Sequence, residues 1–179
     1  MKMIFLYFNL MKILFATLIY IACVIFANYT ATDFYHFPFF GMVSVGTLIF
    51  GITFTQRDRI HANGKSYVYI VIIFTAILNS LFSIYWKIDS RIIVASFTSI
   101  VIAEITDTEI YHKLLHEKWI YRVTKSNAVS VPIDSFMFNS IAFFGILTNM
   151  DILSLIIGEI IIKYFISILS ALNISFFKK

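Results

Sequence analysis

Charged residues are scarce in this sequence, and cysteine and proline are nearly absent. Asp, Glu, Lys and Arg make up 13% of the 179 residues, whereas about 25% is usual in a soluble domain. A hydrophobic fraction of 60% and a mean hydropathy of +0.87 exclude an ordinary soluble domain and place the chain in the membrane class. The single cysteine, Cys23, excludes an internal disulfide.

Linkers and repeats are also missing, so we expect a single transmembrane domain over residues 1–179. The chain has no G-x-S-x-G motif, and its G-K-S triplet lacks the first glycine of a phosphate-binding loop, because Arg59 stands there. Glu109, His112 and His116 share a helical face, but the H-E-x-x-H spacing is absent and a solvated helix end is the commoner reading. We therefore expect no enzyme activity, no cofactor and no metal site.

Six hydrophobic segments approach the length of about 20 residues that a bilayer span requires. They predict an all-α integral membrane protein with a bundle of six transmembrane helices. The segments cover residues 3–28 or 13–28, 37–55, 67–86, 92–111, 126–145 and 152–177. In the second of them, Gly41, Gly46 and Gly51 are spaced so that another helix can approach closely.

The N-terminal segment has an alternative interpretation as a signal peptide, because Lys2 precedes an apolar stretch. Lys12 interrupts that stretch, however, and no A-x-A cleavage site follows it cleanly. We expect the segment to be retained as the first span.

Basic residues are distributed unevenly between the connections, which predicts the orientation. Cytoplasmic connections carry the excess of Lys and Arg. The two chain ends and the connections after the second and fourth segments carry eleven Lys and Arg residues. The connections on the opposite side of the membrane carry only Lys87 and Arg91. The eleven are Lys2, Lys12, Arg57, Arg59, Lys65, Lys113, Lys118, Arg122, Lys125, Lys178 and Lys179. We expect a multi-pass protein of the cytoplasmic (inner) membrane with both termini in the cytoplasm, and we attribute the net charge of +4 to orientation rather than to nucleic-acid binding.

Carboxylates in the fourth and fifth segments are the strongest functional signal. Glu104 and Asp107 share one helical face with Tyr111, and Asn127 and Asp134 share a face in the next segment. Three carboxylates facing lipid would cost on the order of 8–10 kcal/mol, so these side chains face protein or water. The two helices are expected to be antiparallel, with Glu104 and Asp134 close to the membrane midplane and facing one another across a shared cavity.

Two readings of these acids remain open. In the first, they line a substrate or ion pathway. In the second, their role is structural: they lie nearer the cytoplasmic edge, or they are protonated and hydrogen-bonded between helices. Glu159 and Lys163 differ from them, because Glu followed by Lys at i, i+4 is the favourable order for a pair within one helix. We interpret that pair as mutual neutralisation.

Three stretches together resemble the queuosine precursor transporter family, which is also called the VUT or vitamin-uptake-transporter-like family. They cover about half of the chain and contain Arg57–Asp58, the Glu104 and Asp107 pair, and Asn127 with Asp134. The stretches are F-G-I-T-F-T-Q-R-D-R-I-H-A-N-G-K (50–65), A-S-F-T-S-I-V-I-A-E-I-T-D-T-E-I-Y-H-K-L (95–114) and S-N-A-V-S-V-P-I-D-S-F-M-F-N-S-I-A-F (126–143). The resemblance implies six membrane helices and uptake of 7-cyano- and 7-aminomethyl-7-deazaguanine.

The substrate-binding residues expected from this resemblance and from the residue chemistry are Asp58, Glu104, Asp107, Tyr111, Asn127 and Asp134. Glu104 or Asp134 would accept hydrogen bonds from the guanine-like edge. Asp107 would receive the aminomethyl cation or a coupling proton, Tyr111 or Phe138 would stack on the ring, and Asn127 would bind the carbonyl.

The expected partners are the small-molecule substrate and the lipid bilayer, with a homo-oligomer or a separate energising subunit as further options. Two alternatives stay open for the function: a proton-coupled carrier for another small vitamin or nucleobase, and a membrane assembly protein that transports nothing.

Overall fold

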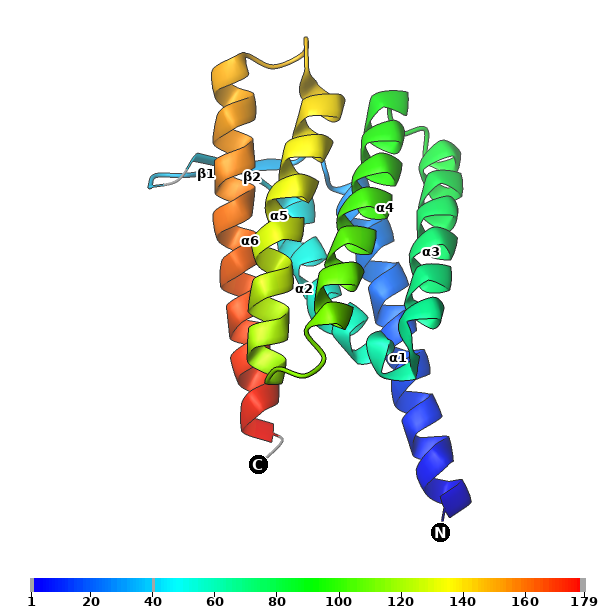
Figure 1. Ribbon diagram of the computed structural model, residues 1–179. Helices are drawn as coiled ribbons and strands as arrows, with labels where there is room; N and C mark the ends of the chain where they lie inside the picture. The colour runs from blue at the N-terminus through cyan, green and yellow to red at the C-terminus, as the bar shows by residue number, and fades with distance from the viewer. Residues whose placement is uncertain (1, 40, 178–179) are drawn as a thin grey trace.

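The computed structural model describes residues 2–39 and 41–177, with side chains described over 10–39 and 41–169, and over this part of the chain it forms a helical bundle (Figure 1). The six α-helices are α1 (Lys2–Tyr29), α2 (Val45–Ile60), α3 (Lys65–Tyr85), α4 (Ser90–Lys113), α5 (Trp119–Phe143) and α6 (Asn149–Phe177). A short 3-10 helix, η1 (His61–Asn63), follows α2 directly. Strands β1 (Phe34–Phe37) and β2 (Gly41–Ser44) form an antiparallel hairpin between α1 and α2.

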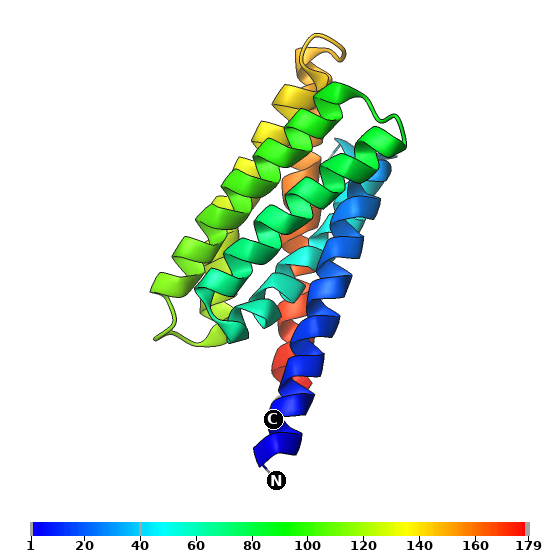
Figure 2. The ribbon, with the colours of Figure 1, turned by 90° about the vertical axis from the view of Figure 1, so that its right-hand side faces the viewer.

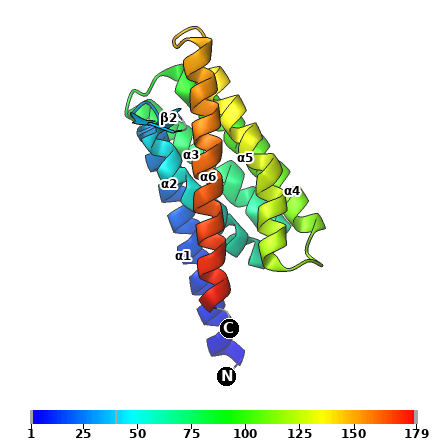
Figure 3. The same cartoon turned by 90° about the vertical axis from the view of Figure 1, so that its left-hand side faces the viewer.

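The helices run alternately up and down, so the two ends of the bundle are distinct. Both chain termini, η1 and the α4–α5 connection lie at the lower end in Figure 1, whereas the α3–α4 and α5–α6 connections lie at the upper end. Helix α3 packs against α1 and α4 (Figure 2), and α6 packs against α2 and α5 (Figure 3). The antiparallel arrangement expected for α4 and α5 is therefore confirmed.

The described basic residues behind the orientation prediction gather at the lower end of the bundle, but one of them is not a surface charge. Arg57 lies in the last turn of α2 and is buried in the bundle with 2% of its surface exposed, so it is not part of a connection between helices. Lys178 and Lys179 lie outside the described residues. The other eight gather at the lower end, because α1 begins there, η1 separates α2 from α3 there, and α4 and α5 meet there.

The second hydrophobic segment, 37–55, does not form a single span, and this prediction was wrong. Its first part is the turn and second strand of the hairpin, and the helix begins only at Val45. Pro38 has no backbone N–H and Gly41 has a φ of +91°, a combination that suits a turn and not a helix. Ser44 then caps α2, because its hydroxyl accepts a hydrogen bond from the Thr47 backbone N–H at 3.2 Å.

Three helices in the described part of the chain are long and apolar enough to cross a membrane. They are α1 over Leu10–Tyr29, α3 over Lys65–Tyr85 and α6 over Asn149–Leu169. Helix α2 has 16 residues, which at 1.5 Å each makes about 24 Å. Helices α4 and α5 are longer but carry buried polar side chains on their inner faces. The described part of the chain contains six helices, and the prediction that each of them crosses the membrane stays a prediction.

The bundle is apolar outside and partly polar inside, as the lipid solvent demands. Phe74, Phe136 and Phe165 project outward with 56–61% of their surfaces exposed. A core of apolar side chains around Tyr20 and Ile72 fills the space between α1, α2 and α3. Most buried polar residues lie instead along α2, α4, α5 and α6, where they build the site described below.

The close packing predicted for Gly41, Gly46 and Gly51 is confirmed, although Gly41 lies in β2 and only the other two lie on α2. A Cβ on Gly46 would lie 2.2 Å from the Ala27 carbonyl oxygen of α1. A Cβ on Gly51 would lie 2.8 Å from the Ile166 side chain of α6. These close approaches hold α2 in the middle of the bundle, where its polar residues face inward.

Candidate functional site

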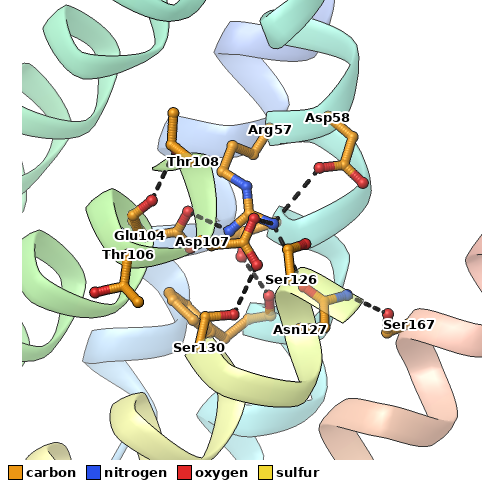
Figure 4. Close-up of polar contacts among 12 residues, drawn as sticks. Arg57, Asp58, Glu104, Thr106, Asp107, Thr108, Ser126, Asn127, Ser130 and Ser167 are labelled. Atoms are coloured by element: carbon orange, nitrogen blue, oxygen red, sulfur yellow. Dashed lines mark hydrogen bonds and ion pairs between the residues drawn. The ribbon is translucent and has the colours of Figure 1, made fainter. Parts of the chain in front are cut away.

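Arg57 on α2 is the centre of a buried ion-pair cluster, which we call the Arg57 cluster: Arg57, Asp58, Glu104 and Asp107 (Figure 4). Its Nη1 lies 2.7 Å from Glu104 Oε2, and its Nη2 lies 2.7 Å from Asp107 Oδ2. The Asp58 Oδ1 is farther away, at 3.5 Å from Nη2. Each of these side chains is at least nine-tenths buried, so water screens the charges only weakly.

Neutral polar groups from α5 and α6 complete the surroundings of the Arg57 cluster. Ser130 donates a hydrogen bond of 2.7 Å to Asp107 Oδ1, and Arg57 Nη2 donates one of 3.4 Å to Asn127 Oδ1. Asn127 Nδ2 in turn donates to Ser167 Oγ on α6 at 2.5 Å (Figure 4). The polar contacts thus link four helices, α2, α4, α5 and α6, at one level of the bundle.

A second buried cluster, which we call the Lys163 cluster, joins α5 to α6 and contains Lys163, Asp134 and Glu159. The Lys163 ammonium lies 2.8 Å from Asp134 Oδ2 and 3.0 Å from Glu159 Oε2, and it also donates to Ser135 Oγ at 2.9 Å. The same ammonium lies 5.7 Å from the ring centre of Phe50 on α2, within the range of a cation–π contact.

The Lys163 cluster forms one wall of a cavity of about 50 Å³ between α1, α2, α4, α5 and α6. Its lining combines the charged groups with aromatic and small polar side chains, among them Asn28, Phe50, Ser99, Asp134, Phe138 and Lys163. A water molecule needs about 10–15 Å³ by this measure, whereas ligand pockets are usually about 300 Å³ or more. In this conformation the cavity has room for a few waters but is smaller than the pockets that usually bind a bicyclic molecule.

A larger hollow of about 1010 Å³, which we call the basin, lies at the lower end of the bundle. Asp58, His61, Tyr111, Trp119 and Arg122 are part of its lining. The Tyr111 ring packs on His61 with ring centres 4.9 Å apart, and burial lowers the pKa of His61 below its ordinary value. Because Asp58 lines the basin and also contacts Arg57, the basin reaches the Arg57 cluster directly.

The residues predicted for the site lie in three places. Asp58, Glu104, Asp107 and Asn127 meet at Arg57. Asp134 lines the cavity with Lys163, while Tyr111 lines the basin instead. The expectation that Glu104 and Asp134 face one another across a shared cavity was wrong, because Glu104 is not among the residues lining that cavity and its carboxylate binds Arg57.

The sequence interpretation missed the ion pairs that Arg57 and Lys163 make between helices. Arg57 was counted among the orientation charges, although it pairs with acids on α2 and α4. The Glu159–Lys163 pair is confirmed at 3.0 Å, but Lys163 also binds Asp134 on the neighbouring helix. A usable signal existed for Lys163, because several acids in apolar helices call for cations nearby and Lys163 lies within an apolar run. Arg57 gave no such signal, because it stands between Gln56 and Asp58.

The third acid of the fourth segment, Glu109, faces away from the cluster. Its carboxylate pairs with Lys65 at 2.6 Å and accepts a hydrogen bond from the Tyr69 hydroxyl, both on α3. Within the side chains that the structure describes, no group of three His, Cys, Asp or Glu residues is arranged to hold a metal ion. Glu109 therefore serves as a link between α3 and α4.

Comparison with known proteins identifies the family. A family model described as putative vitamin uptake transporter matches residues 65–176, a range that covers α3 to α6 and contains Glu104, Asp107, Asn127, Asp134 and Lys163. Arg57 and Asp58 precede the matched range. Neither a curated protein nor a solved structure matches the chain. The match extends over more than half of the sequence, and with its apolar helices and polar interior the chain belongs to this family of membrane transporters.

Proposed function

We propose that this protein imports the queuosine precursors 7-cyano- and 7-aminomethyl-7-deazaguanine across the cytoplasmic membrane. The observation that carries the proposal is the buried carboxylate of Asp134, which faces a cavity beside an ammonium group and aromatic rings. Family membership supports transport of a small molecule, and the sequence resemblance described above supports this substrate class.

The Lys163 cluster matches the hydrogen-bonding edge of a guanine-like base. That edge presents a carbonyl acceptor beside a ring N–H and an exocyclic amine, which are both donors. The Asp134 carboxylate accepts from the two donors, and the Lys163 ammonium donates to the carbonyl. Glu159 keeps its 3.0 Å contact with Lys163, so the ammonium remains paired when Asp134 turns to the substrate.

Phe50 and Phe138 supply the apolar faces for the bicyclic ring. Both line the cavity, from α2 and α5, whereas Tyr111 lies in the basin. Stacking of a base on an aromatic ring contributes about 1–3 kcal/mol. Phe138 thus takes the stacking role for which Tyr111 was the other candidate, and Lys163 takes the carbonyl contact first assigned to Asn127.

The basin is the proposed release route at the cytoplasmic end. Both termini lie at this end together with the described basic connections, which supports a cytoplasmic location for the basin. A substrate moving from the cavity to the basin passes the Arg57 cluster, because Asp58 lines the basin and contacts Arg57. Labelling of single cysteines placed at His116 and at Asn149 tests the orientation, since only the latter should react from outside the cell.

Uptake is tested by measuring queuosine in tRNA from cells that lack both precursor synthesis and their own importer. With nanomolar-scale precursor supplied, we expect queuosine only in cells carrying the intact gene. The Asp134→Asn variant should lose this activity while reaching the membrane in normal amounts. The matched control is Glu117→Gln, which removes a carboxylate paired with Lys125 outside the site.

The other outcomes separate the alternatives. Absence of queuosine with the intact protein in the membrane would overturn this substrate and favour another vitamin or base, or a missing energising subunit. Loss of folding in Asp134→Asn, with no ligand-dependent effect in the intact protein, would favour a membrane assembly role.

A further inference from the structure

Buried carboxylates outnumber buried cations in the part of the bundle whose side chains are described. The cations are Arg57 and Lys163, and the carboxylates are Asp58, Glu104, Asp107, Asp134 and Glu159. Fully ionised, the two clusters would carry three uncompensated negative charges in a low-dielectric interior. An unpaired buried charge costs several kcal/mol, so protons or cationic ligands must neutralise part of this excess.

The Arg57 cluster shows which carboxylate is in surplus. The guanidinium makes its two short contacts, both 2.7 Å, with Glu104 and Asp107. Asp107 Oδ1 accepts a hydrogen bond from the Ser130 hydroxyl, and Asp107 Oδ2, although without a hydrogen-bond partner, lies 2.7 Å from the guanidinium. Asp58 lies 3.5 Å from the guanidinium, and its other oxygen, Oδ2, is buried without a hydrogen-bond partner. Asp58 is therefore the least compensated acid of the cluster.

Asp58 also has a path to water. It lines the basin, which opens at the lower end of the bundle. The charged and titratable groups that surround it or line the basin with it are Arg57 and Arg59 on its own helix, His61 on η1, Lys12 on α1, Lys65 on α3, Glu104, Asp107, Tyr111 and His112 on α4, and Arg122 on α5. Among the described side chains no hydrogen bond joins Asp58 to another acid, so proton exchange would run through the basin.

A metal cation fits this position poorly. The guanidinium already occupies the space between the carboxylates, and hard cations such as Na⁺ or Ca²⁺ need several oxygen ligands directed at one point. The described side chains provide no such group of acids. A proton needs only one oxygen and adds no volume.

We propose that Asp58 carries an exchangeable proton and that this proton moves with the imported substrate. Only the coupling of this proton to substrate import rests on the proposed function; the proton site itself does not. In the release step the O–H bond of the Asp58 carboxylic acid breaks, and the proton passes to water in the basin. The carboxylate that remains strengthens its pairing with Arg57. Reprotonation when the site faces the opposite side completes the cycle, so the proton gradient supplies the energy.

The proton site is tested without any substrate by infrared spectroscopy on the purified protein. The wild type should show the C=O stretch of protonated carboxylic acids at pH 7, and Asp58→Asn should reduce this absorption by the contribution of one group. Glu117→Gln, which removes a partly exposed carboxylate at the same end, should leave it unchanged. Absence of the absorption in the wild type, or an unchanged absorption in a folded Asp58→Asn variant, would overturn the proton site whatever molecule is transported.

Coupling is tested by precursor uptake into proteoliposomes with and without a pH gradient. For one proton per substrate, a gradient of one pH unit supports about tenfold accumulation in the wild type. Asp58→Asn should no longer respond to the gradient. Uptake by the wild type that ignores the gradient would overturn the coupling, whereas an infrared band without any precursor uptake would refute the proposed substrate and leave the proton site standing.

Discussion

Lys163 on α6 and Asp134 on α5 form a buried ion pair, with 2.8 Å between Nζ and Oδ2, that lines the cavity in the middle of the bundle. The pair joins two helices and at the same time presents one donor and one acceptor to the cavity. Stability and ligand binding therefore depend on the same two side chains, and experiments must separate the two effects.

Replacing Lys163 by Gln should destabilise the protein strongly. The change leaves Asp134 and Glu159 buried without their cation, and removing one partner of a buried pair costs about 3–5 kcal/mol. Thermal unfolding in detergent measures the effect. Lys125→Gln is the matched control, since its pair with Glu117 is exposed and should contribute less than about 1 kcal/mol. Equal melting temperatures for the two variants would contradict the buried role of Lys163.

Arg57 and Arg59 should respond very differently to substitution by Gln. Arg57 holds Glu104 and Asp107 in the interior, so Arg57→Gln is expected to cost about 3–5 kcal/mol and to reduce the amount of folded protein. Arg57→Lys should recover only part of this loss, because one ammonium cannot reproduce the fork of the guanidinium. Among the described side chains, Arg59 makes its side-chain hydrogen bond to Gln56, at 3.4 Å, and has no ion pair, so Arg59→Gln should be nearly neutral. Fluorescence-detected size-exclusion chromatography of the three variants gives the comparison.

The parts of the fold that depend on hydrophobic length were predictable from the sequence. The segments 92–111 and 152–177 fall within helices, and 67–86 does so except for its last residue, because an apolar run of this length has no other stable form in a membrane. The hairpin was missed because its residues are as apolar as those of a span. Pro38 and Gly41 were the signals in the sequence, and a count of apolar residues does not detect a turn at either of them.

The site was predictable only in part. Burial of Glu104, Asp107, Asn127 and Asp134 followed from the cost of exposing such groups to lipid. Their partners did not follow, because pairing across helices depends on the rotation and depth of each helix, which periodicity within one helix does not determine. The division into an Arg57 cluster and a Lys163 cluster is a property of the packing.

Gly46→Ala should destabilise the bundle more than Gly51→Ala. At position 46 the new methyl group would meet the Ala27 carbonyl oxygen at 2.2 Å, and a backbone atom cannot move aside. Overpacking of this kind costs about 1–3 kcal/mol. At position 51 the obstacle is the Ile166 side chain, which can change rotamer, while alanine gains about 1 kcal/mol of helix propensity. A higher melting temperature for Gly46→Ala than for Gly51→Ala would show that α1 and α2 do not pack as described.

The stability of the protein should depend on pH through His61. Burial, followed by the neighbouring His112, lowers the pKa of His61 in the folded state. The unfolded chain then binds more protons than the folded one as the pH falls through about 6.5, so folding loses stability below that pH. In His61→Gln the melting temperature should fall less between pH 7.5 and 5.5 than in the wild type. His116→Gln, which alters an exposed histidine at the same end, should follow the wild type; equal pH profiles for all three proteins would remove His61 as the cause.

Replacing Phe138 by Leu should weaken substrate binding without greatly affecting the fold. The side chain lines the cavity from α5, and leucine keeps an apolar group there but removes the flat ring on which a base stacks. Loss of about 1–3 kcal/mol corresponds to a rise in Kd of roughly 5- to 150-fold. Phe136→Leu is the matched control, because Phe136 is on the same helix but 61% exposed on the outer surface. Binding of radiolabelled precursor to the purified variants measures both. An unchanged Kd in Phe138→Leu would mean that the base does not stack on Phe138 in this cavity, and a similar loss in Phe136→Leu would point to an indirect effect of the helix on the site.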